Sequence, residues 1–444
     1  MKISKQLSEA VFSLATEEQF NDWIAAVDKE IGGVKWLPLG GIDNNVHTVE
    51  VASDPGLALV ERPTNSIDQL LDLKALETGT TAATPHSGAK QWWGVPAAGL
   101  SAMSDADRRT LADHVRVSMV ESDIPDRPTI VIQDAGTGQH PDDFEGTLLS
   151  LLASNKKSKT HVMGVYNAGG AASYKFCRGA LIASRLAPQL LGGRVDEAGV
   201  SAVRYNPLDP DRFKSGVYEY MAASDGTIIR LHQTELPDLP HGAYVKLVEY
   251  LMPRYARAAH EPKASLWHLF HAALPDPALP FRIVETRVER FPGMSGSITR
   301  RVVSGLQHLL QRTGTADYAD SRVIDLGPED GQLTLRYYVL NEGTEPDAYT
   351  TSDQGLTVML NGQRQITRDR LWLRRSLELF YLYKRLVVLV DGTGLTNAAK
   401  RQVFSSTRET GVDSPLSKKI LDRVIQELRD DDGLYSLDDL VACN

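Results

Sequence analysis

Apolar residues spaced three and four positions apart predict helices in the first quarter of the chain. The stretch that ends at about Ile31 carries Val11, Leu14, Trp23 and Val27 at this spacing. A glycine- and proline-containing loop is expected over residues 32–41. The pair Asp54-Pro55 then marks a helix start, because the carboxylate can cap free amides and proline lacks the unused donor. This second helix is expected to run to about residue 77, with a kink at its internal proline, followed by a loop over residues 78–99.

Between residues 100 and 250, short apolar runs alternate with stretches of helical spacing. The predicted helices cover residues 104–122, 142–154 and 173–186, and the predicted strands cover residues 129–133, 161–165, 217–221, 226–231 and 243–250. Turn residues separate the last three strands, which are therefore expected to be antiparallel neighbours. The pattern predicts an α+β first domain over residues 1–250, with the opening helix as an N-terminal extension.

The remaining chain predicts a smaller α+β domain. Prolines and alanines over residues 251–280 indicate a connector that contains one helix. Beyond it, residues 281–444 form the second domain, with a C-terminal helix. Its predicted strands cover residues 282–289, 333–340, 356–360 and 386–390, and its predicted helices cover residues 297–312, 374–384 and 417–429.

Composition and charge narrow the class of protein. The 444 residues are 42% hydrophobic and 24% charged, which is typical of folded globular chains. A formal net charge of -9 gives no general attraction to nucleic acid or anionic lipid, so such binding would need a local basic patch. Two cysteines cannot build a disulfide framework, and we expect a cytoplasmic protein. Acidic residues interrupt the only N-terminal stretch that could be a secretion signal. The longest apolar run, residues 386–390, is too short to span a membrane, so no membrane partner is expected.

Three polar stretches are candidates for chemistry. Glu61, Asn65 and Asp68 share one stripe of a predicted helix because they are spaced by four and then three residues. Such a stripe can line a site, but it is also typical of a solvated helix face.

The second stretch, Asp134, Gly136 and Gly138, follows an apolar strand. The carboxylate is a hydrogen-bond acceptor, and the glycines have no side chain that would keep a flat polar ligand from the backbone. An ordinary strand-to-loop turn has the same residues. The third stretch, residues 164–173, contains Gly164, Gly169 and Gly170 before an expected helix start, where free amides can cradle phosphate, although glycines there also serve packing.

The phosphate-loop signature GxxxxGK[ST] is absent from the sequence. The three stretches nevertheless occur in the order helix stripe, strand with Asp-x-Gly-x-Gly, and glycine loop. In this order, residues 30–250 resemble the Bergerat-fold or GHKL ATPases, which include gyrase, heat-shock chaperones of that class, histidine kinases, MutL and MORC proteins. The resemblance implies a Bergerat-fold α/β sandwich that binds ATP and Mg²⁺.

The resemblance also implies roles for individual residues. Glu61 matches the general base that activates water for attack on the γ-phosphate, Asn65 matches the Mg²⁺ ligand, and Asp134 matches the acceptor for the adenine amino group. Asp68 matches a second, supporting acidic residue. The remaining matches to nucleotide-contacting positions are Gly136, Gly138, Gly164, Gly169, Gly170, Ser173 and Gly242.

Several positions depart from the family pattern. Asn167 stands where the lid of the family usually has glycine, Ala135 replaces a common asparagine, and Pro63 separates the base from the metal ligand. Gly242-Ala243 replaces a Gly-Thr pair, so a hydroxyl that would assist Asp134 is missing. These departures imply slow turnover or an altered base preference, while the presence of both Glu61 and Asn65 favours hydrolysis.

The second domain resembles the β-α-β transducer that follows the ATPase domain in gyrase, MutL, MORC and chaperone proteins. In those proteins a transducer cation reaches the phosphates. The resemblance makes Lys400 and Arg408 candidates for this role. Each could equally be a surface cation on a loop.

The function expected from this layout is a slow ATPase that dimerises or closes as a clamp on a nucleic acid or protein client. By analogy with stand-alone prokaryotic members, phage defence and DNA transactions are the candidate processes. A histidine-kinase-type protein kinase and an ATP-gated binding module without hydrolysis are the alternatives. The kinase is disfavoured because no helical segment with a phosphoacceptor histidine precedes the nucleotide site.

Overall fold

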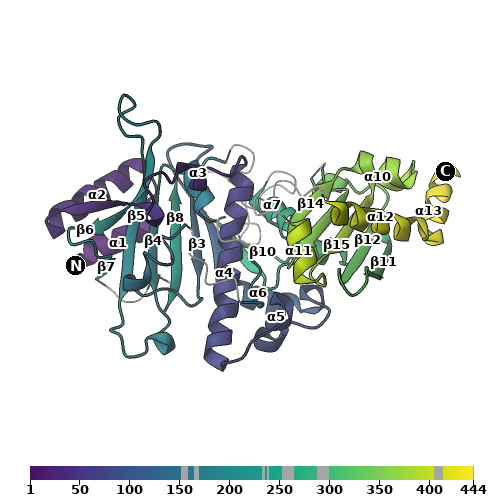
Figure 1. Ribbon diagram of the computed structural model, residues 1–444, viewed down its shortest axis with the longest axis horizontal. Coiled ribbons are helices and arrows are strands. Elements are labelled where there is room, and N and C mark those ends of the chain that lie inside the picture. The colour runs from purple at the N-terminus through teal and green to yellow at the C-terminus, as the bar shows by residue number, and fades with distance from the viewer. Residues whose placement is uncertain are drawn as a thin grey trace. The chain divides into compact units, whose positions relative to one another are not determined.

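The computed structural model describes residues 1–151, 159–164, 170–232, 236–237, 240–252, 265–287, 300–351, 353–404 and 414–443. The chain is α+β and divides into two compact units, each built on a mixed sheet (Figure 1). The first unit comprises Met1–Gly94, Asp105–Trp267 and Pro280–Val303, and the second comprises Val95–Ser104, His268–Leu279 and Ser304–Asn444. Within the described residues, no helix is both long and apolar enough to cross a membrane.

The sheet of the first unit has ten strands among the described residues, in the order β1-β6-β5-β4-β8-β3-β2-β9-β10, with β7 paired to β5. Neighbouring strands are antiparallel except for β2 and β9, which are parallel. The strands are β1 (Val34–Pro38), β2 (Val115–Val120), β3 (Thr129–Asp134), β4 (Gly179–Arg185), β5 (Ala198–Asn206), β6 (Val217–Ala223), β7 (Ile229–Arg230), β8 (Gly242–Val248), β9 (Phe281–Glu285) and β10 (Arg300–Val303).

Helices cover both faces of this sheet. Its helices are α1 (Lys5–Ser13), α2 (Glu17–Ile31), α3 (Val46–Val49), α4 (Pro55–Thr78), α5 (Pro85–Trp93) and α6 (Asp105–Ala112). Side chains of α1 and α2 pack with Val131, Leu181 and Tyr244 in one core. Because side chains alternate along a strand, Ile132 and Asp134 point to the other face, which α4 covers (Figure 1). The two faces of β3 therefore have different roles, with a core on one side and a cavity on the other.

Helix α4 follows the prediction closely. Asp54 accepts a hydrogen bond from the Leu57 amide at 2.9 Å, and Pro55 occupies the first turn. The helix runs through Pro63 without a break, although that residue can donate no backbone hydrogen bond. It ends at Gly79, which has the left-handed conformation that favours glycine at this position.

The second unit is built on a five-stranded sheet with the order β11-β12-β15-β13-β14. Helices α10, α11, α12 and α13 pack on one face of this sheet, while α9 packs with Tyr338, Met359 and Leu389 on the other. The elements are β11 (Ala316–Asp325), β12 (Gln332–Leu340), β13 (Leu356–Leu360), β14 (Gln363–Arg368), β15 (Leu386–Asp391), α9 (Leu306–Leu310), α10 (Arg370–Leu377), α11 (Asn397–Val403), α12 (Pro415–Arg429) and α13 (Asp432–Cys443). Helix α7 (Leu266–Ala273) is the one helix predicted for the connector.

Three of the predicted helices contain strands, and the bounds of a fourth differ from the prediction. Residues 173–186 form a short 3-10 helix, Ala171–Phe176, followed by β4, in which every residue is buried. Such a strand has no period of two to reveal it. Residues 104–122 form α6 and then β2, in which alternate residues are buried. Residues 297–312 include β10 and the short α9, and α10 begins before the predicted start at residue 374.

Other predictions fail in loops and in strand pairing. The predicted loops at residues 32–41 and 78–99 contain β1 and α5, and the opening helix is two helices, divided where Thr16 caps α2. The described parts of residues 142–154 and 161–165 hold neither the long helix nor the strand. Strands β6, β7 and β8 are not neighbours of one another, since β5 pairs with both β6 and β7 and β8 pairs with β3 and β4. Strand β9, which was assigned to the second domain, pairs with β2 in the first sheet.

Candidate functional site

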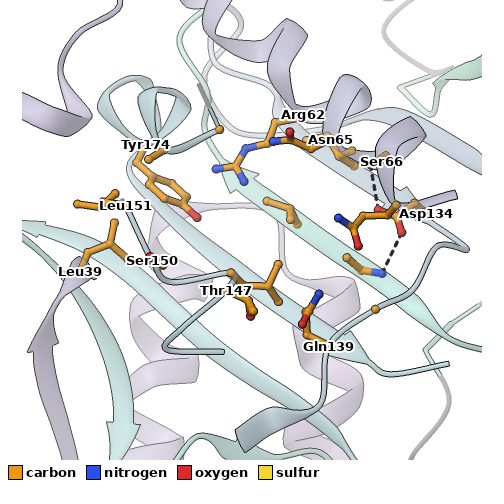
Figure 2. A pocket seen from close by; sticks show the side chains of 18 of the residues that line it. Leu39, Arg62, Asn65, Ser66, Asp134, Gln139, Thr147, Ser150, Leu151 and Tyr174 are labelled. Carbon is orange, nitrogen blue, oxygen red and sulfur yellow. Dashed lines mark hydrogen bonds between the residues drawn. The ribbon is translucent and has the colours of Figure 1, made fainter. Parts of the chain in front are cut away.

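A cavity of about 460 Å³ lies on the α4 face of the first sheet (Figure 2). This volume is in the range of small-molecule sites in proteins. Its lining residues come from α4, from the ends of β3 and β8, and from loops: Leu39, Arg62, Asn65, Ser66, Gln69, Ile132, Asp134, Gly138, Gln139, Gly146, Thr147, Leu148, Ser150, Leu151, Gly170, Ala171, Tyr174, Ala243 and Val245. All three polar stretches found in the sequence thus contribute to one cavity.

Asp134 is the buried carboxylate of this cavity. It is the last residue of β3 and is 4% exposed. Oδ1 accepts hydrogen bonds from the Gly136 amide at 3.0 Å and the Ala243 amide at 3.3 Å, and Oδ2 accepts from Ser66 Oγ at 2.9 Å (Figure 2). Burial raises the pKa of Asp134 to about 6, although these hydrogen bonds act in the opposite direction. The carboxylate is held in place and can accept a further donor from a ligand.

Three predicted glycines allow the backbone to approach closely around Asp134. Gly138 has φ of +59°, and a Cβ atom there would overlap the carbonyl oxygen of Arg185. Gly242 has φ of +111°, and a Cβ atom there would overlap the carbonyl oxygen of Asp134. A Cβ atom on Gly136 would overlap Gln69 of α4. Of the three glycines, only Gly138 lines the cavity; the other two shape the strand ends beside it.

Asn65 and Gly170 form a close contact between α4 and the third stretch. A Cβ atom added to Gly170 would lie 3.0 Å from Asn65 Nδ2. Both residues line the cavity, as the resemblance implied for a metal ligand and a lid glycine. Ser173 does not line it, but its hydroxyl donates to the Gly170 carbonyl oxygen at 2.8 Å and therefore supports this wall.

Arg62 is a cavity residue to which the sequence analysis gave no role. Its Nε donates to Ser173 Oγ at 2.9 Å, and its Cζ lies 4.7 Å from the centre of the Tyr174 ring. Its Nη2 is buried and has no hydrogen-bond partner among the residues that the structure describes. The signal was present in the sequence, since Arg62 stands three residues before Asn65 and four before Ser66 on the same helix.

Asp68 and Asp72 anchor the chain that leads to Gly164. The carboxylate of Asp68, which is fully buried, accepts from the amides of Met163 at 2.6 Å and Gly164 at 3.1 Å. One turn further along α4, Asp72 contacts Lys159 Nζ at 2.6 Å and His161 Nε2 at 3.1 Å. Burial acts to raise the pKa of Asp72, but the bonds from His161 and Lys159 lower it overall. Neither Asp68 nor Gly164 is among the residues that line the cavity, although both were predicted to contact the nucleotide.

Two of the predicted catalytic residues, Glu61 and Lys400, are not among the residues that line the cavity. Glu61 is on α4 and 8% exposed. Lys400 is on α11 of the second unit. Burial lowers the pKa of Lys400, while the carboxylate of Asp391 acts to raise it. Gly169 and Arg408 lie outside the described residues, as does Asn167.

The described residues contain no cluster of three or more histidine, cysteine, aspartate or glutamate side chains that could hold a metal ion. No protein-family model matches the chain, and no curated protein matches it either. The cavity is lined by a buried carboxylate, an amide side chain and a guanidinium, those of Asp134, Asn65 and Arg62.

Proposed function

We propose that the first unit is a Bergerat-type, GHKL-like ATP-binding domain and that the chain is a slow Mg²⁺-dependent ATPase. The observation that carries this proposal is that Asn65 and Asp134, far apart in the sequence, line one cavity of about 460 Å³. The resemblance in the sequence assigns Asn65 to the metal end of ATP and Asp134 to its base. A shared cavity is what these two roles require.

Asp134 is suited to hold an adenine ring. Its carboxylate is an acceptor on the cavity wall, and Ser66 and two backbone amides fix its position. The exocyclic amino group of adenine would donate to this carboxylate. The apolar side chains of Ile132 and Val245 line the same cavity and would pack against the flat faces of the base.

The residues present also fit Mg²⁺. Asn65 offers an amide oxygen on the cavity wall, and Mg²⁺ usually takes few protein ligands beside phosphate oxygens and water. When bound, the ion would neutralise charge on the phosphates. Glu61 stands one helical turn before Asn65 on α4 and would accept the proton of the attacking water at its carboxylate.

In this proposal the nucleotide cycle acts beyond the first unit. Lys400 or Arg408 of the transducer-like second unit would contact the γ-phosphate, and ATP would favour closure or homodimerisation on a nucleic acid or protein client. Sedimentation of the full chain tests the dimer: a nonhydrolysable ATP analogue should increase the dimer fraction over that with ADP. An equal dimer fraction with both nucleotides would contradict nucleotide-driven dimerisation.

Phosphate release tests hydrolysis directly. Glu61→Gln should lower kcat by roughly 100-fold or more, the usual contribution of a positioned base, with little change in ATP affinity. Glu18→Gln, which alters an exposed glutamate of α2, is the matched control and should leave both constants unchanged. Hydrolysis that survives Glu61→Gln at the wild-type rate would contradict the role of Glu61.

One observation favours the ATP-gated binding module as the second candidate, because Glu61 is not among the residues that line the cavity. That module would bind ATP and release no phosphate in the wild type. A kinase of the histidine-kinase type would instead transfer label from the γ-phosphate of ATP to protein. The same assay with labelled ATP therefore separates all three functions.

A further inference from the structure

We infer that Arg62 forms an oxyanion subsite in the cavity and selects ligands that carry phosphate. This inference rests on the proposed nucleotide site and names the residue of the first unit that would recognise the charge of the ligand. One phosphate contact would then come from α4 itself, in addition to the cation proposed for the second unit.

The guanidinium of Arg62 is held in one orientation. Ser173 Oγ accepts from Nε at 2.9 Å. The Tyr174 ring lies beside the guanidinium, with its centre 4.7 Å from Cζ (Figure 2). Ser173 is held in turn through its bond to the Gly170 carbonyl oxygen. A cation fixed in this way loses little side-chain freedom when it binds a ligand.

The remaining side of the guanidinium lacks a partner. Nη2 is buried without a hydrogen bond, and the described residues offer Arg62 no carboxylate within ion-pair distance. A buried donor on a charged group is costly unless something satisfies it. Arg62 lines the cavity, so an anion in the cavity would satisfy it.

The surroundings favour phosphate among anions. Asn65 is on the same face of α4, and a Cβ atom on Gly170 would lie 3.0 Å from Asn65 Nδ2 and 3.7 Å from Arg62 Nη1. Glycine at this position therefore lets the third stretch pack closely against both side chains. The planar fork of a guanidinium matches two oxygens of one phosphate group, and an amide beside it can bind a third.

Arg62 also stands one helical turn before Ser66, which bonds Asp134. Along α4, the cation of the cavity is therefore one helical turn from the serine that bonds its carboxylate. A ligand with a hydrogen-bond donor at one end and phosphate at the other matches this order, as a nucleotide does.

Binding constants for ATP, adenosine and tripolyphosphate test the inference on the full chain. Arg62→Gln should weaken ATP and tripolyphosphate by roughly 10- to 100-fold, the effect of losing hydrogen bonds to a charged group, and should leave adenosine unchanged. Arg212→Gln, an exposed arginine of the same unit, is the control and should bind all three ligands as the wild type does. Should Arg62→Gln fail to fold, Arg62→Lys keeps a positive charge without the fork and should show a smaller loss confined to the two phosphorylated ligands.

The outcomes separate this inference from the proposed function. Wild-type binding of ATP with no loss in either Arg62 variant overturns the Arg62 subsite and leaves the ATP site standing. Wild-type binding of tripolyphosphate that depends on Arg62, without binding of ATP, supports the subsite and removes the nucleotide proposal. Equal losses for ATP and adenosine would mean that Arg62 supports the wall of the cavity, and would also overturn the subsite.

Discussion

At the scale of single residues, the site is defined by polar groups that the fold buries and fixes. Asp134 is buried at the end of a strand and bonded to Ser66, and Arg62 is packed on Tyr174 with one nitrogen left without a partner. Placing these charged groups out of water opposes folding. Their cost is consistent with a ligand site, since perturbed and unsatisfied groups concentrate where ligands bind.

The raised pKa of Asp134 predicts how stability depends on pH. Because this pKa is about 6 in the folded chain and near 3.8 in the unfolded one, the folded chain binds the proton more tightly. The stabilising effect of the proton is complete below pH 4 and is lost as pH rises through about 6. The free energy of unfolding of the wild type should therefore fall by roughly 2 kcal/mol between pH 4 and pH 7, relative to Asp134→Asn.

Urea unfolding at several pH values measures this difference. Asp211→Asn, an exposed carboxylate of the same unit, is the control and should keep the wild-type pH profile. If the free energies of unfolding of wild type and Asp134→Asn change equally between pH 4 and pH 7, the pKa of Asp134 is not raised and this prediction is wrong. ATP affinity gives a second readout: Asp134→Asn should weaken ATP, because the amide presents a donor to the adenine amino group.

Of the residues that line the cavity, sequence reasoning named Asn65, Asp134, Gly138 and Gly170. Asn65 and Asp134 were identified by their order along the chain, which is a property of the sequence. The role of Arg62 depends on Ser173 and Tyr174, more than 100 residues away, and no local pattern indicates that contact. The resemblance assigned Glu61 to catalysis, and its absence from the cavity lining could be seen only in three dimensions.

At the scale of elements, the site depends on how closely β3, β8 and α4 approach one another. Gly242 begins β8 directly against the backbone of Asp134, and Gly136 lies against Gln69 of α4. Asp68 connects α4 to the amides of Met163 and Gly164. The shape of the cavity thus depends on the close packing of these backbone segments and on the buried carboxylate of Asp68, in addition to the side chains that line it.

Gly242→Ala should disrupt this approach. Its φ of +111° disfavours any side chain, and the added Cβ atom would overlap the Asp134 carbonyl oxygen. We expect a loss of more than roughly 3 kcal/mol in the free energy of unfolding, from strain combined with overlap. Gly226→Ala is the matched control, because Gly226 has φ of +86° with no atom within 4 Å of the added Cβ, and it should cost only about 1 kcal/mol. Equal losses in the two variants, measured by urea unfolding, would contradict the close approach.

Helix α4 could be predicted from its start signal, and the fully buried strand β4 could not be predicted from its apolar run. Helix α4 was predicted from Asp54-Pro55, and both cap features are present. Strand β4 is buried along its whole length, so its apolar run had the appearance of a core helix. Helix α5 was missed although Thr84 and Pro85 form a capped start, because the surrounding glycines and threonines favoured a loop.

At the scale of the whole molecule, the two units are not simple successive segments of the chain. Strands β9 and β10 complete the first sheet although they follow the connector, and residues Val95–Ser104 belong to the second unit although they precede β2. The two-part organisation was predictable from composition and alternation. It was not predictable that each unit includes a segment from the other part of the sequence, because the pairing of β9 with β2 joins residues more than 160 positions apart.

The central claim is that one cavity in the first unit holds a purine nucleotide. A crystal structure of the full chain with a nonhydrolysable ATP analogue and Mg²⁺ tests it most directly. The account predicts the amino group of the base within hydrogen-bond distance of the Asp134 carboxylate and phosphate oxygens beside Asn65 and Arg62. An analogue bound elsewhere, or a cavity without nucleotide at saturating concentration, would contradict it.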